Sequence, residues 1–148
     1  MPLWGAGLRA LRPRIIFSLF ILVNMEELHD KVVKAIKDKL NQKDYDVYIN
    51  LGEQKNVRIG DNYPDVIMTE KGKTNAKFIM EVEVASSVTQ DEAERQWKKY
   101  TTEINATFYL VVPEKSLSKA KKLCQNNNIN ARFTTFTVIG NNIIFKFD

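Results

Sequence analysis

The stretch that decides the predicted fold is residues 64–84, PDVIMTEKGKTNAKFIMEVEV. Pro64 opens the segment 65–68, one aspartate followed by three apolar residues, which we expect to form a strand because a proline at the first position removes only one donor from the ladder. Residues 71–75 are polar and contain a glycine, which predicts a hairpin turn. Apolar side chains recur at every second position of residues 77–84, so this segment is expected to be a strand. They share one face, expected to be core: Phe78, Met80, Val82 and Val84.

The periodicity of apolar residues outside this stretch predicts a single α/β domain over residues 25–148. Before it we expect a helix over 25–42 and a strand over 46–51, with a segment at 56–59 that can pair near this strand. After it we expect a helix that starts with a capping box at 89–92 and a buried strand over 107–112. A helix capped by Ser116 and ended by 126–128 follows, and then a hairpin of strands 132–139 and 142–147. The second helix carries an apolar stripe of Ala93, Trp97, Tyr100 and Ile104. The predicted order is helix, three strands, helix, strand, helix and hairpin.

Composition and charge exclude several classes of protein. The 148 residues suffice for one domain with a core of its own. One cysteine, Cys124, and one histidine, His29, exclude an intramolecular disulfide and make a Cys/His zinc site improbable, which favours a reducing, cytoplasmic location. Residues 25–148 carry 19 basic and 18 acidic side chains, so bulk charge gives no support for nucleic-acid binding.

The first 24 residues form a segment with three open interpretations. They contain three arginines and no acid, followed by the apolar run Ile15–Val23. Nine residues are too few to span a bilayer, which needs about 20, so stable membrane insertion is not expected. The segment is then a gene-model extension before a true start at Met25, a secretory signal or an anchor.

Three carboxylates are predicted to converge on one side of the sheet. Glu81 and Glu83 lie two positions apart on the same strand, about 7 Å from each other, on the face opposite the apolar positions. Asp65 heads the neighbouring strand, where pairing brings it near Glu81. Such a group of hard oxygen donors suits Mg²⁺ or Mn²⁺. The alternative is a strand with one solvated face, on which glutamates are ordinary.

These residues resemble the PD-(D/E)xK nuclease superfamily, in particular its RecB-like and archaeal Holliday junction resolvase-like branches. Pro64-Asp65, a hairpin spacer and Glu81-Val82-Glu83 match the family motif in order and spacing, and Gln96 with Tyr100 is similar to the QxxxY motif. The element order matches a restriction-endonuclease-like αβββαβ core, a central mixed sheet flanked by helices, here with a C-terminal helix and β-hairpin extension. One departure is clear, because Glu83 stands where the family has lysine.

The resemblance implies a site and its chemistry. Asp65, Glu81 and Glu83 would hold the metal, with Glu83 as a further ligand or as the base. Gln96 and Tyr100 would position DNA backbone or a metal-bound water, and Glu27 or Glu26 would come from the first helix. Two lysines are candidates to replace the missing positive charge, Lys77 and Lys99, and phosphates could be gripped by Arg58, Arg95 and Lys98. His29 is interpreted as a surface or edge histidine and not as a base.

Three functions compete at this point. The first is a metal-dependent nuclease that hydrolyses phosphodiester bonds in DNA, and the second is an inactive nuclease-like module that binds nucleic acid or a protein, which Glu83 favours. The third is a membrane-tethered binding domain, which depends on the leader. The oligomeric state stays open, although dimers are common in the family. Motifs for phosphate-cradling loops, serine hydrolases and zinc proteases are absent from the sequence.

Overall fold

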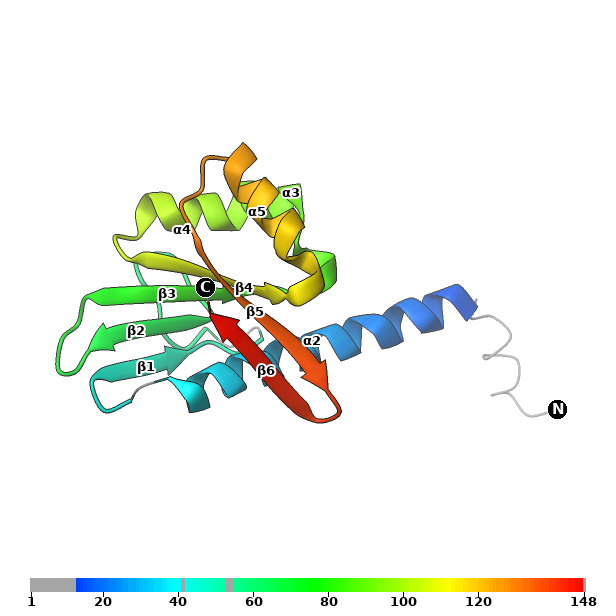
Figure 1. The fold of residues 1–148 in the computed structure, drawn as a ribbon, viewed down its shortest axis with the longest axis horizontal. Helices are drawn as coiled ribbons and strands as arrows, with labels where there is room; N and C mark the ends of the chain where they lie inside the picture. Colours follow the sequence, from blue (N-terminus) through cyan, green and yellow to red (C-terminus); the bar gives the residue numbers. More distant parts are fainter. Residues whose placement is uncertain (1–12, 41, 53–54, 148) are drawn as a thin grey trace.

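The computed structural model describes residues 13–40, 42–52 and 55–147, the first eleven of them by backbone alone. Its centre is a six-stranded mixed sheet whose strands follow one another in chain order (Figure 1). The first three strands are antiparallel, the third to fifth are parallel, and the last two form an antiparallel hairpin. The strands are β1 Tyr45–Ile49, β2 Val66–Glu70, β3 Ala76–Val82, β4 Thr107–Pro113, β5 Arg132–Ile139 and β6 Asn142–Phe147. The predicted mixed α/β fold and its order of elements are confirmed.

Helices cover both faces of the sheet (Figure 1). On one face lies α2, Pro13–Lys39. On the other lie α3, Gln90–Glu92, a π-helical turn over Ala93–Trp97, α4, Lys98–Glu103, and α5, Leu117–Asn126. Each face therefore has its own hydrophobic core.

The two cores explain where the acidic residues of β3 lie. Met80 and Val82 pack with Val32 and other residues of α2, as the predicted alternation requires. The opposite side of β3 faces the α3–α5 layer, where Ile79 packs with Trp97. Successive residues of a strand point to opposite faces, so the side chains that follow Ile79 at every second position also lie under this layer. The alternative of a solvated face is therefore wrong.

Several predicted local features differ from the structure. The first helix begins at Pro13 instead of Met25, so the predicted boundary lies inside α2, because no breaker interrupts the run before Met25. The segment 56–59 forms only a single bridge, Ile59 to Asn62. Ser116 stands before α5 without a capping hydrogen bond from its side chain, because it belongs to a 3₁₀ turn, Glu114–Ser116. Leader residues 1–12 lie outside the described part of the chain. In the part that is described, no helix combines the length and apolar content needed to cross a membrane.

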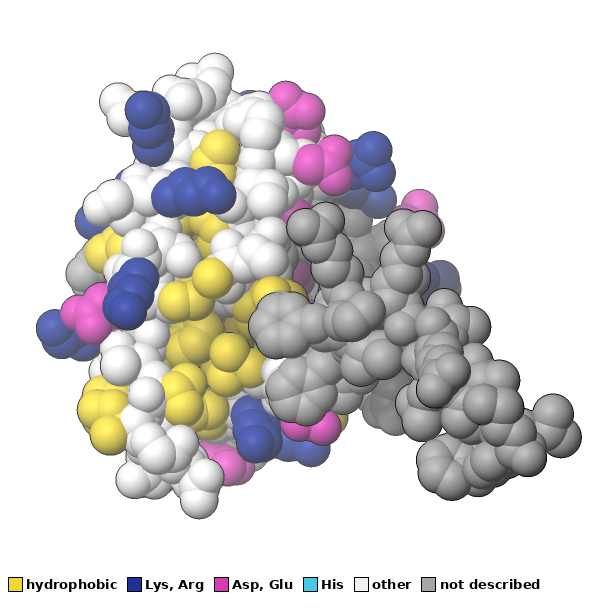
Figure 2. Space-filling view, turned by 90° about the vertical axis from the view of Figure 1, so that its right-hand side faces the viewer, with side chains coloured by type: hydrophobic (Ala, Val, Ile, Leu, Met, Phe, Trp, Pro, Cys, Tyr) yellow, Lys and Arg dark blue, Asp and Glu magenta, His cyan; other side chains and the backbone are white. Residues whose placement is uncertain are grey.

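Part of the surface is apolar. Viewed from the right-hand side of Figure 1, hydrophobic side chains gather in one area with lysine and arginine side chains around it (Figure 2). The exposed large hydrophobics of the described residues include four from the β5–β6 hairpin, Val138, Ile139, Ile144 and Phe147. These residues lie on the last two strands of the sheet.

Leu110 tests the core under the α3–α5 layer. It is completely buried on the central strand β4. We expect Leu110→Ala to lower the free energy of unfolding by about 2–5 kcal/mol, because it leaves a cavity between sheet and helices. The matched control Ile139→Ala removes an aliphatic side chain that is 58% exposed and should change stability by less than about 0.5 kcal/mol. Chemical denaturation of both variants measures the difference, and equal effects would contradict this packing.

Candidate functional site

Asp65 and Glu81 are held together by two hydrogen bonds at the shared end of β2 and β3. Val66 pairs with Met80, which places Asp65 opposite Glu81 in the antiparallel register. The Asp65 amide donates to Glu81 Oε1 at 2.9 Å, and the Val82 amide donates to Asp65 Oδ2 at 2.8 Å. The predicted convergence of these two carboxylates is thus present, and the backbone of both strands fixes it.

Glu83 lies just beyond β3 and turns toward the helical layer. Its amide donates to the Val111 carbonyl at 2.8 Å, which continues the pairing with β4. Its side chain is 4% exposed, and Oε1 accepts a hydrogen bond from the Trp97 indole at 2.9 Å. Trp97 was interpreted only as a core residue. The described residues contain no group of three or more His, Cys, Asp or Glu side chains arranged to hold a metal. Of the three predicted ligands, Asp65 and Glu81 form a close pair, and Glu83 lies beside them bound to Trp97.

His29 of α2 contacts Asp65, a contact that the interpretation as a surface or edge histidine did not include. Its Nε2 lies 3.0 Å from Asp65 Oδ2, and its Nδ1 lies 3.0 Å from Asp30 Oδ1. Asp30 Oδ1 also accepts from the Gly52 amide at 3.0 Å. Burial alone would lower the pKa of His29, but hydrogen bonds and charges from Asp65 and Asp30 outweigh it and raise this pKa to about 9. A protonated His29 therefore joins α2 to the acidic end of the sheet at neutral pH.

Gln96 and Tyr100 approach the same carboxylates from the helical layer, as predicted. With its amide nitrogen toward the carboxylates, Gln96 donates to Glu81 Oε2 at 3.3 Å and to Glu92 Oε2 at 2.7 Å, and its oxygen accepts from the Tyr100 hydroxyl at 3.3 Å. Burial, reinforced by the charge of Glu81, raises the pKa of Tyr100, so its hydroxyl stays protonated.

Glu92 is a site residue that the sequence reasoning placed only in a capping box. Thr89 does accept a hydrogen bond from the Glu92 amide at 3.2 Å, as that box predicts. The Glu92 carboxylate, however, meets Gln96 in the π-helical turn. π-Helical turns are rare in proteins as a whole, and those that occur are often found at functional sites. The QxxxY spacing could have directed attention to the residue one turn earlier, Glu92.

Burial makes the charged forms of these acids costly. It is the largest cause that raises the pKa of Glu81 well above its usual value, followed by the charges of Asp65 and Glu83. Burial also raises the pKa of Glu83 to about 7, although hydrogen bonds from Ser87 and Trp97 oppose it. The pKa of Glu92 is raised by burial, then by Asp91 and Asp65. A bound cation or protons would relieve this repulsion.

Two open pockets meet at this cluster. The first, which we call the acidic pocket, has a volume of about 770 Å³, and its ionisable lining residues are Glu26, His29, Asp30, Asp65, Glu81, Glu83 and Glu92. The second, the mixed-charge pocket, has a volume of about 440 Å³, and its ionisable lining residues other than tyrosine are Lys55, Asp61, Asp65, Glu92, Arg95 and Lys99. Both pockets share Gly52, Asp65, Glu92 and Gln96. Both acids of the pair therefore line the acidic pocket, and Asp65 also borders the basic side chains of the mixed-charge pocket.

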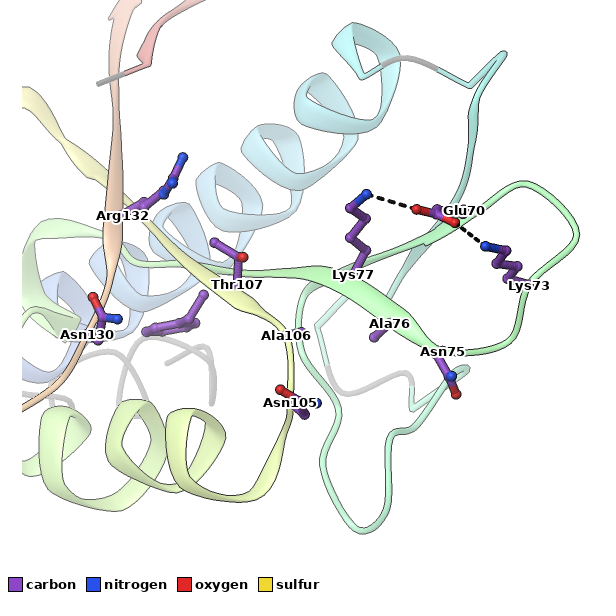
Figure 3. Close-up of a pocket in the computed structure, with 11 residues that line it drawn as sticks. Glu70, Lys73, Asn75, Ala76, Lys77, Asn105, Ala106, Thr107, Asn130 and Arg132 are labelled. Carbon is purple, nitrogen blue, oxygen red and sulfur yellow. Dashed lines mark hydrogen bonds and ion pairs between the residues drawn. The ribbon is translucent and has the colours of Figure 1, made fainter.

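Some predicted site residues lie elsewhere. Glu27 is exposed and is not among the residues that line the acidic pocket, whereas Glu26 is. Lys77 shares the strand face of Glu81 but lies near the opposite end of β3, where its Nζ pairs with Glu70 at 2.8 Å (Figure 3). Lys98 donates to the carbonyl of Asn127 at 2.8 Å, and Arg58 lines a pocket that neither adjoins the acids nor includes Asp65. Of the predicted basic residues, Arg95 and Lys99 remain near the site.

Comparison with protein-family models, curated proteins and solved structures finds no match to this chain. The resemblance to PD-(D/E)xK nucleases therefore depends on the residues described above.

His29 provides a direct test of the contacts at Asp65. Because it is the only histidine of the chain, its imidazole signals in an NMR titration need no assignment by mutation. In EDTA we expect a pKa of about 9, raised from 6.5. The stability that His29 contributes is then complete below about pH 6.5 and is lost as pH rises through about 9. Asp65→Asn should move this pKa down, and a wild-type value at or below 6.5 would contradict the His29–Asp65 contact.

Glu83→Gln tests the cost of the buried acid. The folded protein holds the Glu83 proton up to about pH 7, so this residue lowers stability as pH rises from 4.5 through 7. In EDTA we expect the variant to match the wild type at pH 4 and to be more stable at pH 8.5, by on the order of 3 kcal/mol. The exposed control Glu27→Gln should change stability by less than about 0.5 kcal/mol at both pH values. Denaturant unfolding at the two pH values measures it, and a variant less stable at pH 8.5 would refute the assignment.

Proposed function

We propose that this domain is a metal-dependent nuclease of the PD-(D/E)xK type that hydrolyses phosphodiester bonds in DNA. The observation that carries the proposal is the pair of hydrogen bonds that locks Asp65 and Glu81 together at one end of the sheet. In the family motif these are the positions of the two principal metal ligands. A helix, three antiparallel strands, a helix and a parallel strand surround them, which supports a restriction-endonuclease-like core.

The donor set suits a hard divalent cation. Asp65 and Glu81 would hold Mg²⁺ or Mn²⁺ through carboxylate oxygens, the ligands that these ions prefer. Their closeness in a buried setting raises the pKa of Glu81, so a cation would stabilise what is otherwise a repulsive pair. When bound, such an ion polarises a phosphodiester oxygen and lowers the pKa of a coordinated water.

The residues of the chain itself supply the remaining functions. Glu83, with a pKa of about 7, is matched to accept a proton from an attacking water near neutral pH. Gln96 orients Glu81 and Glu92 through its amide and is held in turn by Tyr100. Arg95 and Lys99 line the adjoining pocket, where they can neutralise phosphates of the bound strand. Binding should therefore weaken with salt.

A second candidate is a module of the same fold that binds nucleic acid without cutting it. Its supporting observation is the bond from Trp97 to Glu83, which holds that carboxylate toward the helical layer. Neither lysine predicted to replace the missing positive charge lines the acidic pocket, since Lys77 lies beside Glu70 and Lys99 lines the mixed-charge pocket. This module would bind DNA in Mg²⁺ or Mn²⁺ and leave it intact.

Cleavage of labelled DNA in Mg²⁺ or Mn²⁺ separates the two candidates. We expect metal-dependent cleavage that EDTA stops and that Asp65→Ala reduces by more than about 100-fold, because even the outer partners of metal ligands typically contribute 10- to 100-fold. The matched control is Glu70→Gln, which removes an exposed carboxylate that pairs with Lys73 and Lys77 at the far end of the sheet and should leave the rate unchanged. Binding without cleavage in both metals would refute the nuclease and favour the module.

A further inference from the structure

We propose that the mixed-charge pocket binds one unstacked nucleotide of single-stranded DNA beside the carboxylate pair. This inference deepens the proposed function and rests on it for the identity of the ligand. The pocket lies between the loop that leads from β1 to β2 and the helical layer, and it includes Asp65 and Gln96 in its lining. A nucleotide held there would place its neighbouring phosphate next to the acidic pocket.

Asn50 braces the described part of the loop wall of the pocket. The side chain of Asn50 is 4% exposed, and both its amide nitrogen and its amide oxygen form hydrogen bonds within this loop. Its Nδ2 donates to the carbonyls of Val57 and Pro64 at 2.8 and 2.7 Å, and its Oδ1 accepts from the amides of Asn56 and Val57 at 2.9 and 2.8 Å. Preorganisation of this kind lowers the entropic cost of binding a ligand.

Asn62 gives the first sign that the pocket has an occupant. Its side chain is 5% exposed and lines the pocket. Its Nδ2 donates to Glu103 Oε2 at 3.4 Å, while its Oδ1 is buried and has no partner among the described residues. A buried acceptor without a donor lowers stability, so its presence at a pocket needs an explanation. The ring and exocyclic N–H groups of a nucleobase are donors that can satisfy an amide oxygen.

Tyr63 gives the second, independent sign. It lines the pocket with Lys55, whose Nζ lies 5.3 Å from the centre of the tyrosine ring. An aromatic ring beside basic groups is the arrangement on which unpaired bases stack while their phosphates are neutralised. Two further cations are held by exposed carboxylates, Arg95 by Asp91 at 3.0 Å and Lys99 by Glu103 at 3.9 Å. Exposed ion pairs contribute little, so a phosphate can displace these partners.

Size and access favour a single strand over a duplex. A volume of about 440 Å³ lies within the roughly 300–1,000 Å³ typical of small-ligand pockets, enough for one nucleotide. A base inside a duplex must first leave its stack to enter such a pocket, which costs a few kcal/mol. Single-stranded DNA does not carry the full cost and should bind more tightly.

The pocket in Figure 3 lacks the features of the mixed-charge pocket on which this inference depends. It lies near the start of β3 and also contains basic residues, but two of them, Lys73 and Lys77, are bound to Glu70 (Figure 3). Its lining includes neither a tyrosine nor any residue of the acidic pocket. It therefore serves as the control for general attraction of DNA to positive charge.

The test is binding of a labelled single-stranded oligonucleotide and its duplex, measured by fluorescence anisotropy in EDTA. We expect tighter binding of the single strand, and a loss of about 5- to 100-fold in Tyr63→Ala, the range typical of one base stacked on an aromatic ring. Tyr63→Phe keeps the ring and should bind like the wild type. Two controls should also bind like the wild type, Tyr48→Ala, which removes an exposed tyrosine outside the pocket, and Lys77→Ala.

A second measurement does not depend on any variant folding. An oligonucleotide with 5-iodouracil, cross-linked by light to the wild-type protein, should be joined at Tyr63 when the product is mapped by mass spectrometry. Equal binding of single strand and duplex, unchanged binding by Tyr63→Ala or a cross-link elsewhere would overturn the inference. Because EDTA prevents metal-dependent cleavage, these outcomes are independent of the nuclease assay: cleavage with duplex-selective binding would leave the proposed function and remove only this pocket.

Discussion

The crossed hydrogen bonds between Asp65 and the end of β3 determine the rest of the candidate site. Each strand presents a backbone amide to the carboxylate of the other, and these bonds fix both acids at the shared end of β2 and β3. His29 then attaches α2 to Asp65, and Gln96 attaches the helical layer to Glu81. Both helical layers thus meet the sheet at its most highly charged point, which explains how a buried acidic cluster keeps a defined geometry.

This arrangement lowers the stability of the fold relative to an apolar core. Buried Glu81 and Glu83 both have raised pKa values, mainly through desolvation, which means that their ionised forms oppose folding. Apolar side chains at these positions would continue the packing around Ile79 and Trp97. Local destabilisation of this kind is common where a protein performs a function. We propose that a cation bound in the acidic pocket offsets this cost.

Much of this could be predicted from the sequence because it depends on short-range periodicity. The pleat alone puts Glu81 and Glu83 on one face, and a hairpin of fixed register brings Asp65 to Glu81. The remainder depends on choices that periodicity does not record. An apolar stripe places Trp97 in the core without showing where its indole N–H points, and a π-helical turn is a choice of hydrogen-bond partner along an otherwise ordinary helix. The contact between His29 and Asp65 depends on the angle at which α2 packs on the sheet, and periodicity along the sequence does not show this angle.

The most direct test of the account is anomalous diffraction at the manganese edge from crystals of the wild-type protein soaked in Mn²⁺. The account predicts a peak in the acidic pocket, bonded to carboxylate oxygens of both Asp65 and Glu81. A well-ordered structure at saturating Mn²⁺ without a peak at these oxygens would contradict it, because the closely held carboxylates would then have no role as metal ligands.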